Sequence, residues 1–143
     1  MQLEFRQTYA TNVFVFIKKG AMNAKIRRID MLYCAKQYAL PQMEVIAPKM
    51  AICLGRSTFE AIRDSLDKER PVFAEAHKSE HRINHRGTEI YGVPHPGSRG
   101  TQNAGGKLRV LEIWRILANR LIEICGTGAS KVDQLPEGNP PLI

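Results

Sequence analysis

Long hydrophobic runs and cysteines are both scarce in this sequence. No stretch of about 18 apolar residues occurs among its 143 residues, which excludes a membrane-spanning helix. Residues 1–6 lack the apolar core of a secretory signal, so we expect no export. The three cysteines, Cys34, Cys53 and Cys125, are widely spaced and odd in number. They form no zinc or CxxC pattern, which predicts a reducing, cytoplasmic compartment.

Aromatic residues and acidic charge are also scarce. The chain has five Phe, four Tyr and one Trp, and its 14 Asp and Glu face 21 Lys and Arg, which gives a net charge of +7. A basic domain of this kind favours polyanionic partners, although a solvated surface explains the same charge. The apolar fraction of 43% and the charged fraction of 24% are those of a folded globular chain, which excludes a disordered or fibrous one.

β-branched and aromatic residues cluster near the start of the chain. Residues 8–17 combine Thr, Tyr, Val, Phe and Ile, which predicts a β-strand. Beyond them, apolar residues recur at helical spacing from Asn23, a candidate N-cap, and Pro41 should end or kink that helix. A short second helical piece is predicted over residues 42–47.

The middle of the chain shows the clearest alternation of strand and helix. Residues 50–54 form a short continuous apolar run, which is typical of a strand buried on both faces. A tight glycine turn follows, and Ser57 and Glu60 then form a capping box for the next helix. Residues 88–93 predict a further strand.

Two polar stretches flank this last strand, and a helix follows them. Residues 67–87 are interpreted as a long loop or irregular insertion. The four glycines of residues 96–106 predict a loop at the carboxyl end of the strand. The helix predicted over residues 108–124 has a single apolar stripe. Its members are Val110, Ile113, Trp114, Leu117, Leu121 and Ile124.

The alternation of elements predicts an α/β fold, a three-layer α/β/α arrangement with helices on both faces of a short parallel sheet. We expect one domain over residues 1–125 and a mobile tail over residues 126–143. In open α/β sheets, ligands bind outside the carboxyl ends of the strands. Polar residues gather at three such ends: Asn12; Gly55, Arg56 and Ser57; and His95, Pro96, Gly97 and Ser98.

Three of these residues suit a nucleobase or an anion. His95 lies between two prolines, and its ring can donate a hydrogen bond to a developing negative charge. Asn12 can donate and accept at once, as reading a nucleobase edge requires. Ser57 begins a helix whose first amides can hold a phosphate. Each also has an ordinary interpretation: a turn histidine, an asparagine bonded to local backbone, and simple helix capping.

Two other site patterns are incomplete. His77, His81 and His85 recur every four residues, as ligands on one helix face would. No cysteine or carboxylate completes a convincing set beside them, so we predict no metal site. A GxSxG elbow is missing as well, which argues against a serine hydrolase of that kind.

Three ordered segments resemble the uracil-DNA glycosylase superfamily. Residues 9–14 (YATNVF) are similar to the family strand whose Asn reads the uracil edge. Residues 46–55 (IAPKMAICLG) resemble its Pro-Lys, apolar strand, Leu-Gly segment, and residues 93–98 (VPHPGS) resemble its His-Pro-Ser motif. The similarity extends over roughly residues 5–122.

The resemblance implies an enzyme that flips a damaged base out of the duplex and hydrolyses its N-glycosidic bond. By this resemblance, His95 is catalytic and stabilises the leaving anion, and Asn12 binds the base. The expected partner is DNA that contains uracil or a related damaged base, and no cofactor is expected. The residues implied to contact DNA are Gly55, Arg56, Ser57, Pro96, Gly97, Ser98, Arg99 and Asn103.

The sequence departs from the family at its beginning. Only ten residues precede Thr11, and they lack the family's first motif, which carries the group beside the attacking water. The chain thus corresponds to an N-terminally truncated domain without the first strand, and an exposed strand edge would favour association. Gly97 stands where the family has Ser. Cys34 alone matches the cysteines of the iron–sulfur cluster that some branches hold, so no cluster is expected.

Two function classes therefore remain open. The first is a DNA glycosylase, shortened or a fragment of a longer one. The second is a catalytically deficient module that binds nucleic acid or a base and keeps the pocket wall. A different α/β domain with a chance His-Pro loop is a third interpretation. An in-frame extension upstream of Met1, with a Gly-rich motif and an acidic residue, would favour the enzyme.

Overall fold

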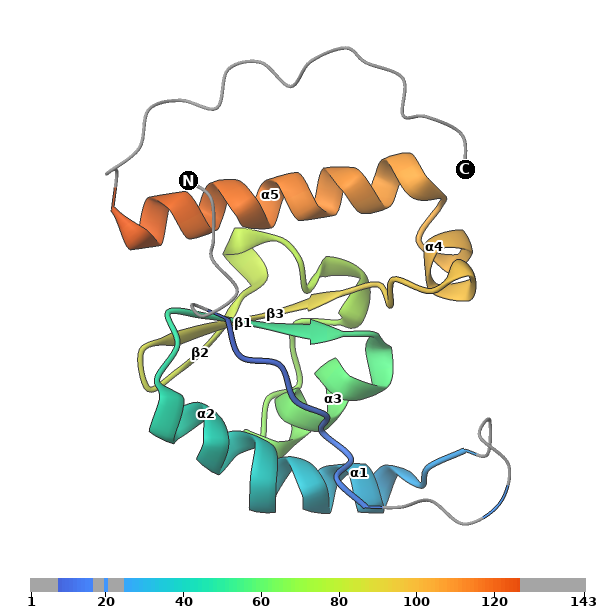
Figure 1. Ribbon diagram of the computed structural model, residues 1–143, viewed down its shortest axis with the longest axis vertical. Helices are drawn as coiled ribbons and strands as arrows, with labels where there is room; N and C mark the ends of the chain where they lie inside the picture. The colour runs from blue at the N-terminus through green and yellow to red at the C-terminus, as the bar shows by residue number, and fades with distance from the viewer. Residues whose placement is uncertain (1–7, 17–19, 21–24, 127–143) are drawn as a thin grey trace.

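A computed structural model describes residues 8–16, 20 and 25–126. The described part holds a three-stranded sheet between two layers of helices (Figure 1). Helix α5 (Lys107–Cys125) covers one face of the sheet, whereas α1 (Arg28–Cys34), α2 (Leu40–Ile46) and α3 (Arg56–Ser65) lie on the other. The predicted α/β class, with helices on both faces of a short sheet, is therefore present.

The sheet is mixed rather than parallel. Its order is β1 (Met50–Leu54), β3 (Thr88–Val93) and β2 (Ile83–His85). Strands β1 and β3 are parallel over their whole length, in a register that ends on the pair Leu54 and Val93. Strand β2 runs antiparallel to β3. The prediction of a parallel sheet is correct for β1 and β3 and wrong for the third strand.

A tight hairpin explains the missed strand β2. The turn between β2 and β3 consists of Arg86 and Gly87, which both have positive φ angles, 47° and 85°. Two central residues with positive φ form the turn type whose twist matches that of paired strands. Within residues 67–87, Gly87 was the one residue whose type could have indicated this turn, because glycine readily adopts a positive φ. The rest of that segment contains two short 3₁₀ turns, Phe73–Glu75 and Ser79–His81.

The strand predicted over residues 8–17 does not form. Residues 8–16 have no regular secondary structure, and residue 17 lies outside the described residues. Val13 and Phe14 nevertheless pack against the hydrophobic core. The prediction of a strand here is therefore wrong, because a strand needs a neighbouring backbone to bond and composition alone does not supply one.

The first helical region continues through Pro41 instead of ending there. A π-helical segment, Ala35–Ala39, joins α1 to α2, and Pro41 stands in the first turn of α2. The π-helical segment changes the hydrogen-bond register directly before Pro41, so the helix continues although the Pro41 nitrogen donates no bond. Asn23, the candidate N-cap, lies outside the described residues.

The turn after β1 is built by glycine rather than by a capping box. Helix α3 begins at Arg56, so the N-cap is Gly55, with φ 89° and ψ 156°. That conformation is disfavoured for residues with a Cβ atom. Ser57 lies within the first turn and makes no capping hydrogen bond. The N-cap predicted at Ser57 is therefore two positions too late, and the observed cap is the backbone conformation of Gly55.

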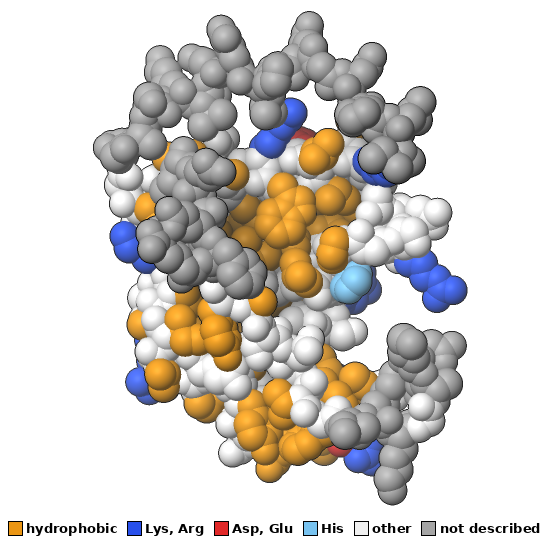
Figure 2. Space-filling view, viewed as in Figure 1, with side chains coloured by type: hydrophobic (Ala, Val, Ile, Leu, Met, Phe, Trp, Pro, Cys, Tyr) orange, Lys and Arg blue, Asp and Glu red, His pale blue; other side chains and the backbone are white. Residues whose placement is uncertain are grey.

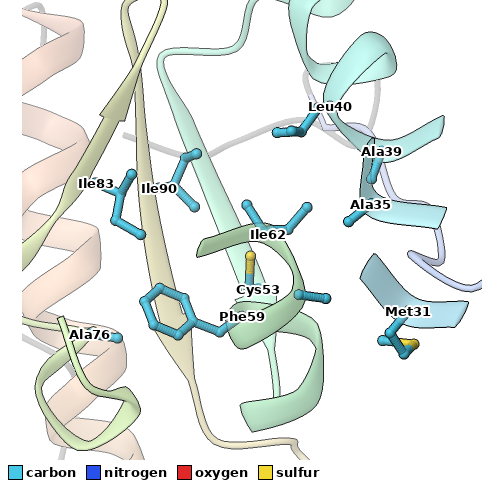
Figure 3. Packing of buried hydrophobic residues seen from close by; sticks show 11 residues of the cluster. Met31, Ala35, Ala39, Leu40, Cys53, Phe59, Ile62, Ala76, Ile83 and Ile90 are labelled. Carbon is cyan, nitrogen blue, oxygen red and sulfur yellow. The ribbon is translucent and has the colours of Figure 1, made fainter. Parts of the chain in front are cut away.

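Two hydrophobic clusters hold the layers together. The larger one lies between the sheet and α1–α3, and Figure 3 shows Phe59 and Ile62 of α3 among Ile90, Cys53 and the π-helical alanines. The smaller one, beneath α5, contains the buried residues Tyr91, Val93, Ile113 and Leu117. Successive residues of β3 thus alternate between the clusters, as a strand covered on both faces must.

The segment after β3 is helical where a loop was predicted. Helix α4 (Ser98–Asn103) precedes α5, whose bounds agree with the apolar stripe. Of that stripe, Ile113 and Leu117 are buried. Within the described residues, no helix is both long and apolar enough to cross a membrane. The predicted mobile tail begins at Gly126, and the rest of it lies outside the described residues.

Candidate functional site

The carboxyl ends of β1 and β3 lie side by side. The backbone N–H of Gly55 donates to the carbonyl of Val93 at 2.8 Å. A Cβ atom added at Gly55 would lie 3.6 Å from the Cβ of His95. The structure therefore brings together the Gly55–Ser57 turn and the loop that carries His95, as parallel pairing of their strands requires.

The imidazole of His95 has a defined proton position. The backbone N–H of Gly97 donates to His95 Nδ1 at 3.0 Å. Because Nδ1 accepts this bond, the ring proton sits on Nε2, where it is available as a donor. The side chain is exposed on the surface. His95 thus presents one outward N–H beside the glycine turn.

Helix α4 packs back onto the His95 loop through a glycine. A Cβ atom at Gly100 would overlap the carbonyl oxygen of His95, so this approach needs the absence of a side chain. Pro96, Gly97, Ser98, Arg99 and Asn103 are all exposed around it. Among the residues implied to contact DNA, those that follow His95 lie on the exposed loop and short helix α4, which together are called the helical corner.

Asn12 lies beside Ser57, although no strand brings it there. Both side chains line a surface hollow of about 620 Å³ between the segment of residues 8–16 and the beginning of α3. His95 is not among the lining residues. The hollow and His95 are instead neighbours through the Gly55–Ser57 turn. The other lining residues are Val13, Phe14, Lys25, Ile26, Met31 and Thr58.

The hollow has a positive electrostatic character. Lys25 is the charged residue among those that line it. The N-terminus of α3 adds its unpaired backbone N–H groups and the positive end of the helix dipole. Arg56, at the same terminus, keeps its guanidinium carbon 5.8 Å from the centroid of the Phe73 ring. An anionic or hydrogen-bonding ligand is the kind that this arrangement would attract.

Sequence reasoning missed two of these residues. Thr58 follows Ser57 at the helix start, so its position was within reach of the pattern. No sequence pattern indicated Lys25 as a site residue, because its position beside the hollow depends on how the segment before α1 packs on α3.

The three regularly spaced histidines have separate environments. His77 is buried, and burial, followed by the charge of Arg109, lowers the pKa of its imidazole. His81 Nε2 lies 3.9 Å from Glu75, and His85 Nε2 lies 3.0 Å from Glu44 of α2. Across the described parts of the chain, no group of three or more His, Cys, Asp or Glu side chains could hold a metal ion.

Comparison with known proteins adds no relative. No family model, no curated protein and no solved structure matches the chain. The resemblance of residues 9–14, 46–55 and 93–98 to glycosylase motifs therefore rests on those segments.

Proposed function

We propose that this chain is a uracil-DNA glycosylase-like protein that binds DNA along the carboxyl edge of β1 and β3. In this proposal, a base displaced from the DNA enters the hollow beside Asn12. The observation that carries the proposal is the bond from the Gly55 N–H to the Val93 carbonyl. This bond holds the N-terminus of α3, which suits a phosphate group, next to the loop of His95, which suits a base that leaves with negative charge.

The backbone of the DNA would be held by the glycine turn and the helical corner. Ser57 and the first amides of α3 suit a phosphate oxygen, and Arg56 adds a positive charge at the same end. Arg99, exposed on α4, provides a second positive charge across the His95 loop. The net charge of +7 favours such contacts at long range.

The hollow suits one flipped base. Its volume of about 620 Å³ lies in the ordinary range of small-molecule pockets. Phe14, Ile26 and Met31 provide apolar walls, and the Asn12 amide provides one donor and one acceptor group for a base edge. Apolar side chains beside one amide group suit recognition of a flipped base, which is held by stacking and by hydrogen bonds to its edge.

Hydrolysis of the glycosidic bond would need two further groups. His95 lies outside the hollow, beyond the Gly55–Ser57 turn, so its Nε2–H would stabilise the negative charge on the departing base only if the base extends toward that turn. The attacking water also needs a residue that positions it, and the described residues that line the hollow include no Asp or Glu. This observation favours the second candidate, a module that binds the base without efficient turnover.

Fluorescence anisotropy with a labelled single-stranded DNA tests the binding. We expect log Kd to rise with log salt, and Arg56→Ala to reduce that slope by about 1. Arg115→Ala is the matched control, since Arg115 is exposed on α5. Affinity that is independent of salt, or equal losses in both variants, would contradict binding at this edge.

A uracil-release assay with the same DNA separates the two candidates. A missing catalytic base typically lowers the rate about 10²–10⁴-fold, so we expect slow or absent release. Release at ordinary enzymatic rates, abolished by His95→Ala, would establish the glycosylase instead of the binding module.

A further inference from the structure

The second edge of β1 is unpaired among the described residues. Strand β1 bonds to β3 through alternate residues: the Lys49 carbonyl accepts from Glu89 N–H at 3.0 Å, and Gly55 N–H donates to Val93 at 2.8 Å. Since backbone groups alternate in direction along a strand, those of Met50, Ile52 and Leu54 point away from β3. No described strand pairs with them.

The five residues of β1 lack the charges and prolines that usually prevent strand addition, although Pro48 and Lys49 lie just before the strand. Strand β1 has five residues, and none of them is charged or proline. Natural edge strands are instead commonly short, charged, bulged or covered. The opposite edge of the sheet is protected in this way, because β2 has three residues and ends at His85, which contacts Glu44 of α2.

Apolar side chains border the same edge. Met50 and Ile52 are only partly buried beneath α5, and Leu54 is 41% exposed. On α5, Arg120 binds Glu89, on the β3 side. The 100° turn per residue places Trp114, 37% exposed, on the opposite flank of the helix. Figure 2, which faces the β1 edge, shows hydrophobic side chains gathered between α5 and the sheet.

We propose that a second copy of this chain pairs with this edge, β1 against β1, antiparallel and centred on Ile52. In this register Ile52 lies opposite Ile52, and Met50 lies opposite Leu54. Lys49 lies opposite Gly55, so no like charges meet. The outward backbone groups of both copies then bond to each other, and the two sheets become one continuous sheet through a two-fold axis.

Self-complementarity favours a second copy over nucleic acid at this surface. The strand is apolar and offers backbone groups in the spacing that another strand matches. Each copy carries a net charge of +7, so long-range repulsion opposes the dimer. Salt screens this repulsion. Dimerisation should therefore strengthen with salt, whereas DNA binding at the carboxyl edge should weaken.

Sedimentation equilibrium of the full chain over a concentration series tests the dimer. We expect a monomer–dimer equilibrium whose Kd falls as salt rises. Leu54→Lys should raise that Kd at least about tenfold, because it sets a charge against the apolar Met50 of the other copy. A chain that stays monomeric at every concentration, or a Kd that Leu54→Lys leaves unchanged, overturns the proposal.

Mixing two variants tests the register. Met50→Glu alone should also weaken the dimer, but a mixture with Leu54→Lys should form heterodimers, since residue 54 of one copy faces residue 50 of the other. Dimers that form as poorly in the mixture as in either variant overturn this register.

Oxidative cross-linking provides a second measurement that does not depend on charged variants. In a Cys125→Ser background, Ile52→Cys should form a covalent dimer with oxidised glutathione, because the two residues meet at the two-fold axis. Val45→Cys, exposed on α2, is the control and should stay monomeric. Equal cross-linking of both variants, or none in either, overturns the proposal.

Discussion

Arg120 of α5 binds the carboxylate of Glu89 on β3 through two hydrogen bonds, one to each oxygen. Arg120 Nε donates to Oε2 at 2.9 Å, and a terminal nitrogen donates to Oε1 at 2.5 Å. The Tyr91 hydroxyl donates to the same carboxylate at 2.8 Å, and Arg82 lies 3.0 Å away. One carboxylate therefore ties α5, the sheet and the segment before β2 together.

This arrangement makes stability depend on pH. The hydrogen bond from Arg120 is the largest influence that lowers the pKa of Glu89, to about 2 from an ordinary 4.5. A carboxyl whose pKa is lower in the folded state contributes stability above its unfolded pKa, and the contribution disappears as pH falls from about 4.5 toward 2. It amounts to at most about 3 kcal/mol.

Urea denaturation between pH 7 and pH 2.5 measures this effect. Glu89→Gln should lower the free energy of unfolding at pH 7 and flatten its decline in acid. Glu112→Gln, which removes an exposed ion pair with Arg109, is the control and should change little. If Glu89→Gln keeps the full acid slope of the parent chain, Glu89 is not its source.

Gly92→Ala should destabilise the fold through a steric clash in the core. An added Cβ would lie 2.8 Å from the Phe59 ring and 3.0 Å from the Cβ of Ala76. Overpacking of this kind costs about 1–3 kcal/mol. Thermal unfolding of Gly92→Ala, Phe59→Leu and the double variant gives the coupling. A double variant whose loss equals the sum of the single losses would contradict the predicted contact.

Ser57→Ala should separate helix capping from ligand binding. Because Ser57 makes no capping hydrogen bond, its loss should change stability by no more than about 0.5 kcal/mol. If Ser57 contacts phosphate, DNA affinity should nevertheless fall. Denaturation and anisotropy on the same sample measure both quantities. A stability loss near 1 kcal/mol with unchanged affinity would instead show that Ser57 acts as a cap.

Asn12→Ala and His95→Ala should leave the fold intact, since both side chains are exposed. If the hollow reads a base, Asn12→Ala should weaken discrimination between uracil-containing and normal single strands by about 1–3 kcal/mol, because polar edges lose their partners. His95 does not line the hollow, so His95→Ala should have the same effect only if the bound base also reaches the His95 ring. Competition binding with matched strands measures this. Equal affinity losses on both strands would assign the two residues to general DNA contact rather than to base recognition.

Strong local patterns allowed several elements to be predicted. Strand β3 and helix α5 have the bounds that alternation and helical periodicity indicated, and β1 follows its continuous apolar run. Because β1 and β3 were expected to be parallel, the meeting of Gly55 and His95 at one edge followed directly. This half of the candidate site was therefore predictable without the structure.

The other elements depended on neighbours that no local pattern reveals. Residues 8–16 have strand composition but pair with none of the described strands, and β2 exists because a two-residue turn folds it back onto β3. Helix α4 forms where glycines suggested a loop, because Gly100 packs on the His95 backbone. For residues 8–16 and β2 the backbone's hydrogen-bonding partner decided the outcome, and for α4 the close packing of Gly100 did.

The sequence by itself determined the α/β class, the paired strands β1 and β3, and the glycine turn beside the histidine loop. These features follow from local hydrophobic periodicity and from residues that only certain turns accept. Only the tertiary structure decided that Asn12 and Lys25 share a hollow with Ser57, and that none of the described strands pairs with the outer edge of β1. Both depend on contacts between segments far apart in the chain, which depend on how the layers pack and not on any local pattern.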